Sequence, residues 1–139
     1  MPFTGSHPAA VLPLLGTPLC ASALVIGSMI PDLPYYAPLP LGSRLTHSLA
    51  GIVGVDPLLG LVVFVAWHGL LVPPALAYAP AALARRLPAD LERGLRRRLR
   101  PAQLPLLYAS FLVGAATHVF WTGSPTRTPG PPTHSTALA

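Results

Sequence analysis

Four histidines and two aspartates lie within or beside the most apolar stretches of this 139-residue chain. They are His7, Asp32, His47, Asp56, His68 and His118. Because the chain has only four acidic residues, half of its carboxylates occur in hydrophobic surroundings. Burial of an ionisable group is costly unless the group is paired, hydrogen-bonded or bound to a cation. The pattern therefore predicts a metal site, a buried polar network or a water-filled cavity in a membrane bundle.

A metal site is consistent with the residue types, because zinc and related metals bind histidine nitrogen and carboxylate oxygen. The candidate ligands are His7 at a predicted helix start, Asp32 at a helix end, and His47 and His118. They are far apart in sequence, so they can share a site only if a helical bundle brings them to one end. No HExxH motif or cysteine pair fixes their geometry. The spacing alone leaves both a metal site and a hydrogen-bonded network open.

Two of the polar residues have a structural interpretation. Asp56 stands directly before Pro57, which is typical of a helix N-cap followed by a proline in the first turn. His68 lies beside Trp67 in the middle of an apolar run and is predicted to be a hydrogen-bonded core residue. His134 lies in a polar tail and is given no role.

The composition indicates a membrane protein. Hydrophobic residues make up 52% of the chain and charged residues 9%, whereas an ordinary soluble domain has about 25% charged residues. The mean hydropathy is positive. Much of the surface is therefore expected to contact lipid, which makes the bilayer the expected partner. The single cysteine, Cys20, excludes an intramolecular disulfide.

The basic residues are concentrated in one segment. Seven of the nine lie between Arg85 and Arg100, and none is a lysine. An amphipathic pattern runs through this segment, with a leucine at every fourth position: Leu87, Leu91, Leu95 and Leu99. Such a segment is predicted to lie in the cytoplasm and to contact anionic lipid headgroups. Nucleic acid is not an expected partner, because no aromatic residues interleave the arginines and apolar segments flank them.

Apolar runs separated by proline and glycine predict an all-α fold, a membrane-associated bundle of about four or five helices. Ser6 is predicted to cap the first helix, and Pro73-Pro74 to kink a long one. The segment 33–43, which contains three prolines, is predicted to be a loop. The helical segments are predicted at 7–15, 19–30, 44–55, 58–83 and 104–121. The helical domain is thus expected to comprise residues 1–121, followed by a disordered tail, 122–139, rich in Pro, Thr, Gly and Ser.

Several segments resemble one bacterial family. They are MPFTGSHPAAVLPLL, SALVIGSMIPDLPYY, RLTHSLAG, DPLLGL, WHGLL and GAATHVFW. Over residues 1–121 the chain closely resembles domain of unknown function 4184 (DUF4184). The resemblance implies a multi-pass helical protein of the bacterial inner membrane. It also implies similarity to membrane-bound metal-dependent hydrolases, which are distantly allied with zinc-dependent phospholipase C and the S1/P1-type nucleases.

In that wider group, a histidine followed four residues later by an aspartate supplies two metal ligands. The resemblance places this histidine at His118. It indicates His7, Asp32 and His47 as further ligands, with Zn2+ as the implied cofactor. The implied activity is hydrolysis of a phosphodiester or related ester by a metal-activated water. The alternative is a non-enzymatic small membrane protein whose buried His/Asp network joins its helices or lines a proton or solute path.

The chain departs from the family pattern directly after Trp121. The family continues with Asp-x-Phe-Thr-His, whereas this chain has TGSPT at residues 122–126. Thr122 thus stands where a carboxylate ligand is expected. An enzyme of this lineage that lacks this ligand is expected to be impaired.

A one-base shift in the reading frame accounts for this departure. Tryptophan is encoded by TGG and threonine by ACN, so reading one base earlier after Trp121 gives GAC, an aspartate codon. The next four shifted codons permit Gly, Phe, Thr and His. We hypothesise that the residues after Trp121 are translated out of frame, and that resequencing the gene will show a shifted frame that spells Trp-Asp-Gly-Phe-Thr-His and stays open. An early stop, or codons that exclude Phe-Thr-His, would contradict the hypothesis.

Overall fold

The computed structural model describes residues 4–87, 91 and 94–123. Every regular element among these residues is helical, which confirms the predicted all-α class. The short elements η1, η2 and η5 are 3-10 helices, and η3 and η4 are π-helical. In chain order the elements are η1 Thr4–Leu14, α1 Ala21–Met29, η2 Ile30–Tyr35, α2 Ser43–Thr46, η3 Gly51–Val55, α3 Asp56–Ala66, η4 Trp67–Leu71, α4 Val72–Ala77, α5 Ala81–Ala84, α6 Leu95–Arg98, η5 Pro101–Gln103 and α7 Leu104–Gly123.

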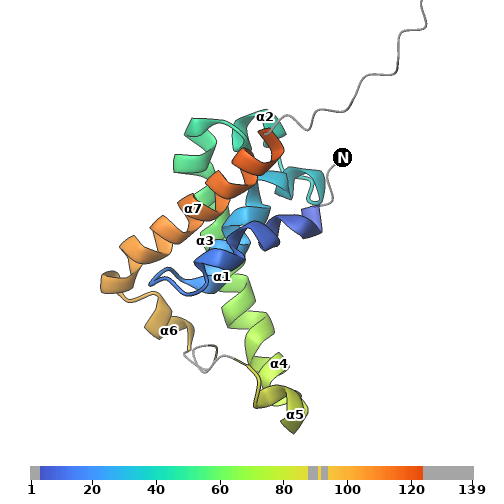
Figure 1. Cartoon of the computed structure of the whole chain (residues 1–139), viewed down its shortest axis with the longest axis vertical. Coiled ribbons are helices and arrows are strands. Elements are labelled where there is room, and N and C mark those ends of the chain that lie inside the picture. Colours follow the sequence, from blue (N-terminus) through green and yellow to red (C-terminus); the bar gives the residue numbers. More distant parts are fainter. Residues whose placement is uncertain (1–3, 88–90, 92–93, 124–139) are drawn as a thin grey trace, which may run out of the picture.

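Helices α1 and α7 lie side by side and run parallel (Figure 1). At their N-terminal ends the backbone N–H of Cys20 donates a hydrogen bond of 2.9 Å to Ser110 Oγ. Near their C-terminal ends His118 Nδ1 lies 2.7 Å from the carbonyl oxygen of Ser28. The two bonds join positions eight residues apart on each helix, so they fix the register of the pair along its length.

Glycine allows the two backbones to approach this closely. A Cβ atom on Gly27 would lie 2.6 Å from the carbonyl oxygen of Phe111, and one on Gly114 would lie 2.8 Å from the backbone nitrogen of Ser28. Small residues at helix contacts are common where helices associate inside a membrane. Larger residues at Gly27 or Gly114 would therefore push α1 and α7 apart.

The hydrophobic core lies where α3 crosses this pair. The rings of Phe64 on α3 and Phe111 on α7 are 6.0 Å apart and nearly perpendicular, at 88°, which is a favourable aromatic arrangement. Ala23 and Leu107 are buried beside them. Gly60 permits the crossing, because a Cβ atom there would lie 2.9 Å from the Phe111 ring.

The longest apolar helix runs from Gly51 to Ala77 and comprises η3, α3, η4 and α4. Proline lacks an N–H donor, and its ring clashes with the carbonyl one turn earlier. The π-helical turn η4 directly precedes Pro73-Pro74, and its wider backbone lets the helix continue past them. The predicted span 58–83 was therefore placed too late in the chain: the helix begins at Gly51 and ends before Pro80, which cannot continue it.

Two helices are long and apolar enough to cross a membrane, Gly51–Ala77 with 27 residues and Pro101–Gly123 with 23. At 1.5 Å per residue they are about 40 and 35 Å long, whereas a bilayer core is about 30 Å thick. The predicted helix 104–121 is confirmed as α7. It includes Thr122 and Gly123, so the predicted domain boundary after Trp121 lies within the helix. The rest of the tail predicted to be disordered falls outside the described residues.

Two predicted N-terminal helices differ from those observed. The segment 7–15 is the 3-10 helix η1, and Ser6 lies inside it rather than at its cap. Pro8 and Pro13 each lack the backbone N–H that an α-helix needs as a donor. This 11-residue segment therefore cannot form a continuous series of α-helical hydrogen bonds. The predicted helix 44–55 is divided, because α2 ends at Thr46. The next residue, His47, caps it, with Nδ1 and the backbone N–H both near the carbonyl of Ser43.

The basic segment is not one continuous helix in the part of the chain that is described. Gly94 has an extended backbone with ψ of 152°, and α6 is limited to Leu95–Arg98. Residues 88–90 and 92–93 of the predicted amphipathic segment lie outside the described residues. Leu95 and Leu99 nevertheless pack against the Phe64–Phe111 core. These two leucines of the predicted amphipathic pattern are thus half-buried against the core, although the helix around them is short.

The close contact of α1 with α7 predicts how Gly114→Ala will behave. The added methyl group meets the backbone of α1, so the helices must separate, at a cost of about 1–3 kcal/mol of unfolding free energy. Gly54→Ala is the matched control, because a Cβ atom there meets nothing within 4 Å. Unfolding in detergent, followed by circular dichroism, measures both variants. A Gly114→Ala protein as stable as the Gly54→Ala protein would contradict the packing described here.

Candidate metal centre

The structure brings the four predicted ligands together. His7 on η1, Asp32 on η2 and His118 on α7 each offer one ligand atom, and these atoms lie within 4.8 Å of one another. His47 follows α2, and its Nε2 lies 3.6 Å from Asp32 Oδ1. We call these four residues the His/Asp centre. It lies at the C-terminal ends of α1 and α7.

His118 is held in one orientation. Its side chain is completely buried, and its Nδ1 lies 2.7 Å from the Ser28 carbonyl oxygen, which can only accept a hydrogen bond. Nδ1 must therefore carry the proton and donate it. The other ring nitrogen, Nε2, is directed toward Asp32 and lies 3.3 Å from its Oδ1. A backbone partner of this kind is how ligand histidines are usually oriented.

His47 is held in the same way. Its Nδ1 lies 2.9 Å from the Ser43 carbonyl, which leaves Nε2 facing Asp32. The neighbouring Thr46 is buried and donates a hydrogen bond of 2.7 Å to the carbonyl of Pro31, next to Asp32 in the chain. This bond fixes the end of α2 against the segment that carries the carboxylate. His47 is more exposed than His118, with 28% of its side chain accessible.

Two histidine Nε2 atoms thus face one carboxylate oxygen. In a neutral imidazole whose Nδ1 carries the proton, Nε2 is a hydrogen-bond acceptor, and so is the carboxylate. Acceptors at 3.3 and 3.6 Å repel unless a positive charge lies among them. The ring of His7 is also stacked on that of His118 at a centroid distance of 4.1 Å, so protonating both rings would place two cations in contact. A divalent cation bound among these acceptor atoms would remove their repulsion. A small number of protons shared between the acceptor atoms would have the same effect.

The donor set fits a zinc-type ion. Zinc bonds to nitrogen and oxygen are about 2.0–2.2 Å long, so neighbouring ligand atoms of a tetrahedral site are about 3.3–3.6 Å apart. The distances from Asp32 Oδ1 to His118 Nε2 and to His47 Nε2 are 3.3 and 3.6 Å. These two separations are compatible with ligands that share one ion. With His7 the set provides three imidazoles and one carboxylate.

Asp56 does not cap a helix, and the prediction that it does is wrong. The backbone is helical through Val55 and Asp56, because η3 leads into α3 without a break. The side chain is 1% exposed, and neither carboxylate oxygen has a hydrogen-bond partner in the described part of the chain. It interacts electrostatically with His47. The Asp-Pro pair was a misleading signal, because the π-helical turn η3 lets a helix that begins at Gly51 continue through Pro57.

His68 lies away from the centre. Its Nε2 is 2.9 Å from Ser22 Oγ, and its ring is 4.4 Å from that of Phe64. The prediction of a hydrogen-bonded core histidine is therefore confirmed.

Thr122 occupies the position one turn after His118 on α7. Its hydroxyl lies 3.0 Å from the carbonyl oxygen of His118 and 3.2 Å from that of Val119, and it donates to its own helix. The Thr122 hydroxyl therefore bonds to its own helix backbone. The family resemblance predicts a carboxylate ligand at this position.

These features define an all-helical protein with a buried histidine and aspartate centre and two helices long enough to cross a membrane. Residues 1–124 match the family described as domain of unknown function (DUF4184), and the chain belongs to this family. No curated protein and no solved structure matches the chain. The family assignment confirms the resemblance seen in the sequence, while the roles of individual residues rest on the geometry above.

Proposed function

We propose that this chain is a multi-pass protein of the bacterial inner membrane whose His/Asp centre binds a divalent metal ion of the zinc type. The observation that supports the metal most strongly is the approach of His118 Nε2 and His47 Nε2 to the same oxygen of Asp32. Both rings have Nδ1 committed to a backbone carbonyl. An ion among these atoms removes the repulsion between acceptors and uses every one of them as a ligand.

The membrane location is supported by apolar side chains that face outward on the long helices. Leu58 and Val62 on α3 are each 67% exposed, and Phe120 on α7 is 79% exposed. Exposed apolar surface of this extent normally marks contact with lipid or another protein. The bilayer would cover these residues along both candidate spans.

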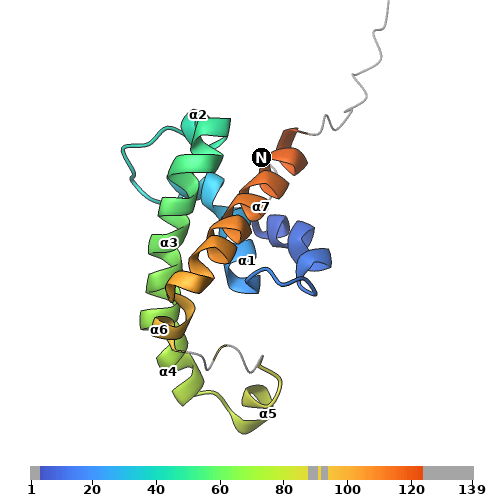
Figure 2. The same ribbon diagram turned by 90° about the vertical axis from the view of Figure 1, so that its left-hand side faces the viewer.

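The arrangement of α3 and α7 suggests an orientation in the membrane. The two helices run in opposite senses along the long axis of the molecule (Figure 2). The basic segment Arg85–Arg100 lies between them in sequence. Positive segments are retained in the cytoplasm, so we place the start of α7 on that side. The His/Asp centre, near the end of α7, then faces the opposite side.

For the chemistry, we propose phosphoester-type hydrolysis as the activity of this centre in the family, and an impaired form of it in this chain. A bound divalent cation supplies a Lewis acid that polarises an ester and activates water. The Ser28 and Ser43 carbonyls hold His118 and His47 in position, and Asp32 provides negative charge. The buried carboxylate of Asp56 interacts electrostatically with His47 and adds negative charge beside the centre. Thr122 offers no carboxylate, which weakens the site.

A second function is favoured by one observation. Asp32 contacts His47 and His118 at once, so protons alone can join η2, α2 and α7 into a buried polar network. In that case the protein is a non-enzymatic membrane protein whose polar residues connect its helices.

Metal content distinguishes the two functions. We expect detergent-purified protein to retain about one zinc ion per chain, measured by mass spectrometry of the acid-digested sample. His118→Ala removes a ligand, and the zinc should be lost. His68→Ala is the matched control, because His68 bonds to Ser22 outside the centre, and its zinc content should be unchanged.

The same experiment includes a variant that restores the expected carboxylate. Thr122→Asp should tighten zinc binding at least about tenfold, whereas Gly123→Asp, which adds the same charge at the next and more exposed position, should not. Absence of zinc from both the unmodified protein and Thr122→Asp would overturn the metal proposal and favour the polar network.

A further inference from the structure

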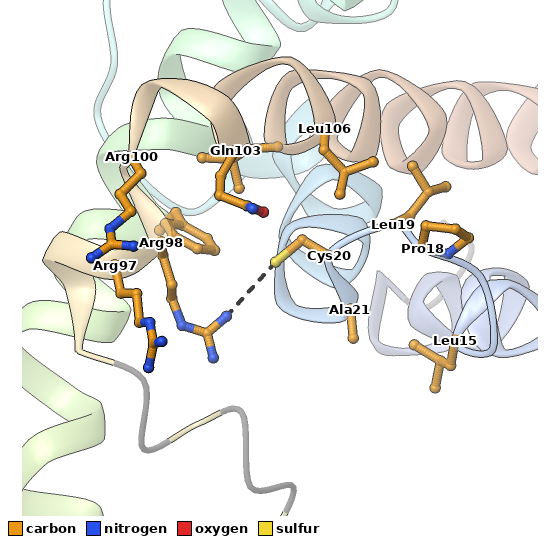
Figure 3. A pocket seen from close by; sticks show the side chains of 12 residues that line it. Leu15, Pro18, Leu19, Cys20, Ala21, Arg97, Arg98, Arg100, Gln103 and Leu106 are labelled. Atoms are coloured by element: carbon orange, nitrogen blue, oxygen red, sulfur yellow. Dashed lines mark hydrogen bonds between the residues drawn. The ribbon is translucent and has the colours of Figure 1, made fainter.

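A second candidate site lies at the opposite end of α1 and α7 from the His/Asp centre. It is a cavity of about 800 Å³ between the start of α1, the start of α7 and α6 (Figure 3). Three arginines and several apolar side chains line it, including Arg97, Arg98, Arg100, Leu19, Leu106 and Phe64. We propose that this cavity binds an anionic phospholipid, with the phosphate at the arginines and an acyl chain along the apolar wall.

The charge of the cavity favours a phosphate. Arg97, Arg98 and Arg100 lie within four consecutive positions, and no carboxylate is among the lining residues that the structure describes. Arg98 reaches toward α1, with Nη1 3.9 Å from Cys20 Sγ (Figure 3). Guanidinium groups bind phosphate through two parallel hydrogen bonds, and they lose less hydration than ammonium groups in doing so. Like charges gathered in one cavity also repel, which a bound anion relieves.

The apolar wall favours a lipid over a free phosphate ion. Leu15, Leu19, Leu106 and Phe64 are among the apolar residues that line the cavity. Inorganic phosphate gains nothing from such a wall, whereas the binding of an acyl chain becomes more favourable with each methylene group that it buries there.

The place of the cavity on α7 matches the depth of a headgroup. Arg100 directly precedes the candidate span Pro101–Gly123, which places the arginines at the membrane surface, where anionic lipids attract them. Leu106 lies six residues further along, about 9 Å deeper at 1.5 Å per residue. The polar and apolar parts of the cavity are therefore ordered like the polar and apolar parts of a phospholipid.

This inference rests on the proposed membrane location but not on the metal. The nine residues of α1, about 13 Å of helix, separate the cavity from the His/Asp centre. Lipid bound at the arginines is thus too far away to be a metal ligand, and binding at the two sites can be measured independently.

The test is native mass spectrometry of the full chain in detergent, titrated with phosphatidylglycerol or phosphatidylcholine. We expect one phosphatidylglycerol to bind at least tenfold more tightly than phosphatidylcholine. Arg97→Gln/Arg100→Gln should remove that preference, while Arg85→Gln/Arg86→Gln, which removes the same charge outside the cavity, should change affinity less than twofold. His118→Ala should lose zinc and keep the lipid, so failure of one site is distinguishable from failure of the other. Circular dichroism checks that each variant is folded.

A second arm separates lipid from free phosphate. Leu106→Asn should weaken phosphatidylglycerol binding severalfold, and inorganic phosphate at millimolar concentration should not displace the lipid. The proposal is overturned if inorganic phosphate competes and Leu106→Asn has no effect, since the site then binds phosphate alone. It is also overturned if the two arginine pairs have equal effects, because the attraction is then a diffuse property of the basic segment.

Discussion

The parallel contact of α1 with α7 is the constraint on which the rest of the structure depends. Gly27 and Gly114 bring the two backbones so close that a Cβ atom on either would meet the opposite helix. This closeness places the Ser28 carbonyl within hydrogen-bond distance of His118. Asp32 follows four residues after Ser28, so the same contact delivers the carboxylate to the histidine. Residues about 90 positions apart in the chain thus meet because two glycines are small.

The same helix pair also explains why the polar groups separate into two places. The C-terminal ends of α1 and α7 hold the His/Asp centre, and their N-terminal ends border the arginine-lined cavity. The Phe64–Phe111 core lies between them. In the proposed membrane orientation, the cavity lies at the cytoplasmic surface and the centre near the opposite one. The His/Asp centre and the arginines of the cavity then both lie away from the middle of the bilayer, where burial of a charge is most costly.

The sequence predicted the features that depend on composition and long apolar runs. The all-α class and the helix that ends near Trp121 follow from hydrophobic length and proline spacing. Grouping His7, Asp32, His47 and His118 depended on the family resemblance, because no short motif joins them. Their proximity in the fold is consistent with that grouping, while metal binding itself stays a prediction.

Other features could not be predicted because they depend on contacts distant in sequence. The burial of Asp56 is set by the helix that precedes it, which an Asp-Pro pair does not reveal. The cavity could not be predicted either, since Arg98 approaches Cys20, 78 positions earlier in the chain, only in the folded protein. Periodicity along the chain contains no information on such pairings.

The central claim is that Asp32 and the histidines around it share one metal ion. Zinc K-edge X-ray absorption of the detergent-purified protein tests this most directly. We predict a first shell of about four nitrogen and oxygen atoms at about 2.0–2.1 Å, with outer-shell scattering from at least two imidazole rings that decreases in His7→Ala. A shell of oxygen atoms without imidazole scattering, or a spectrum unchanged in His7→Ala, would contradict the claim.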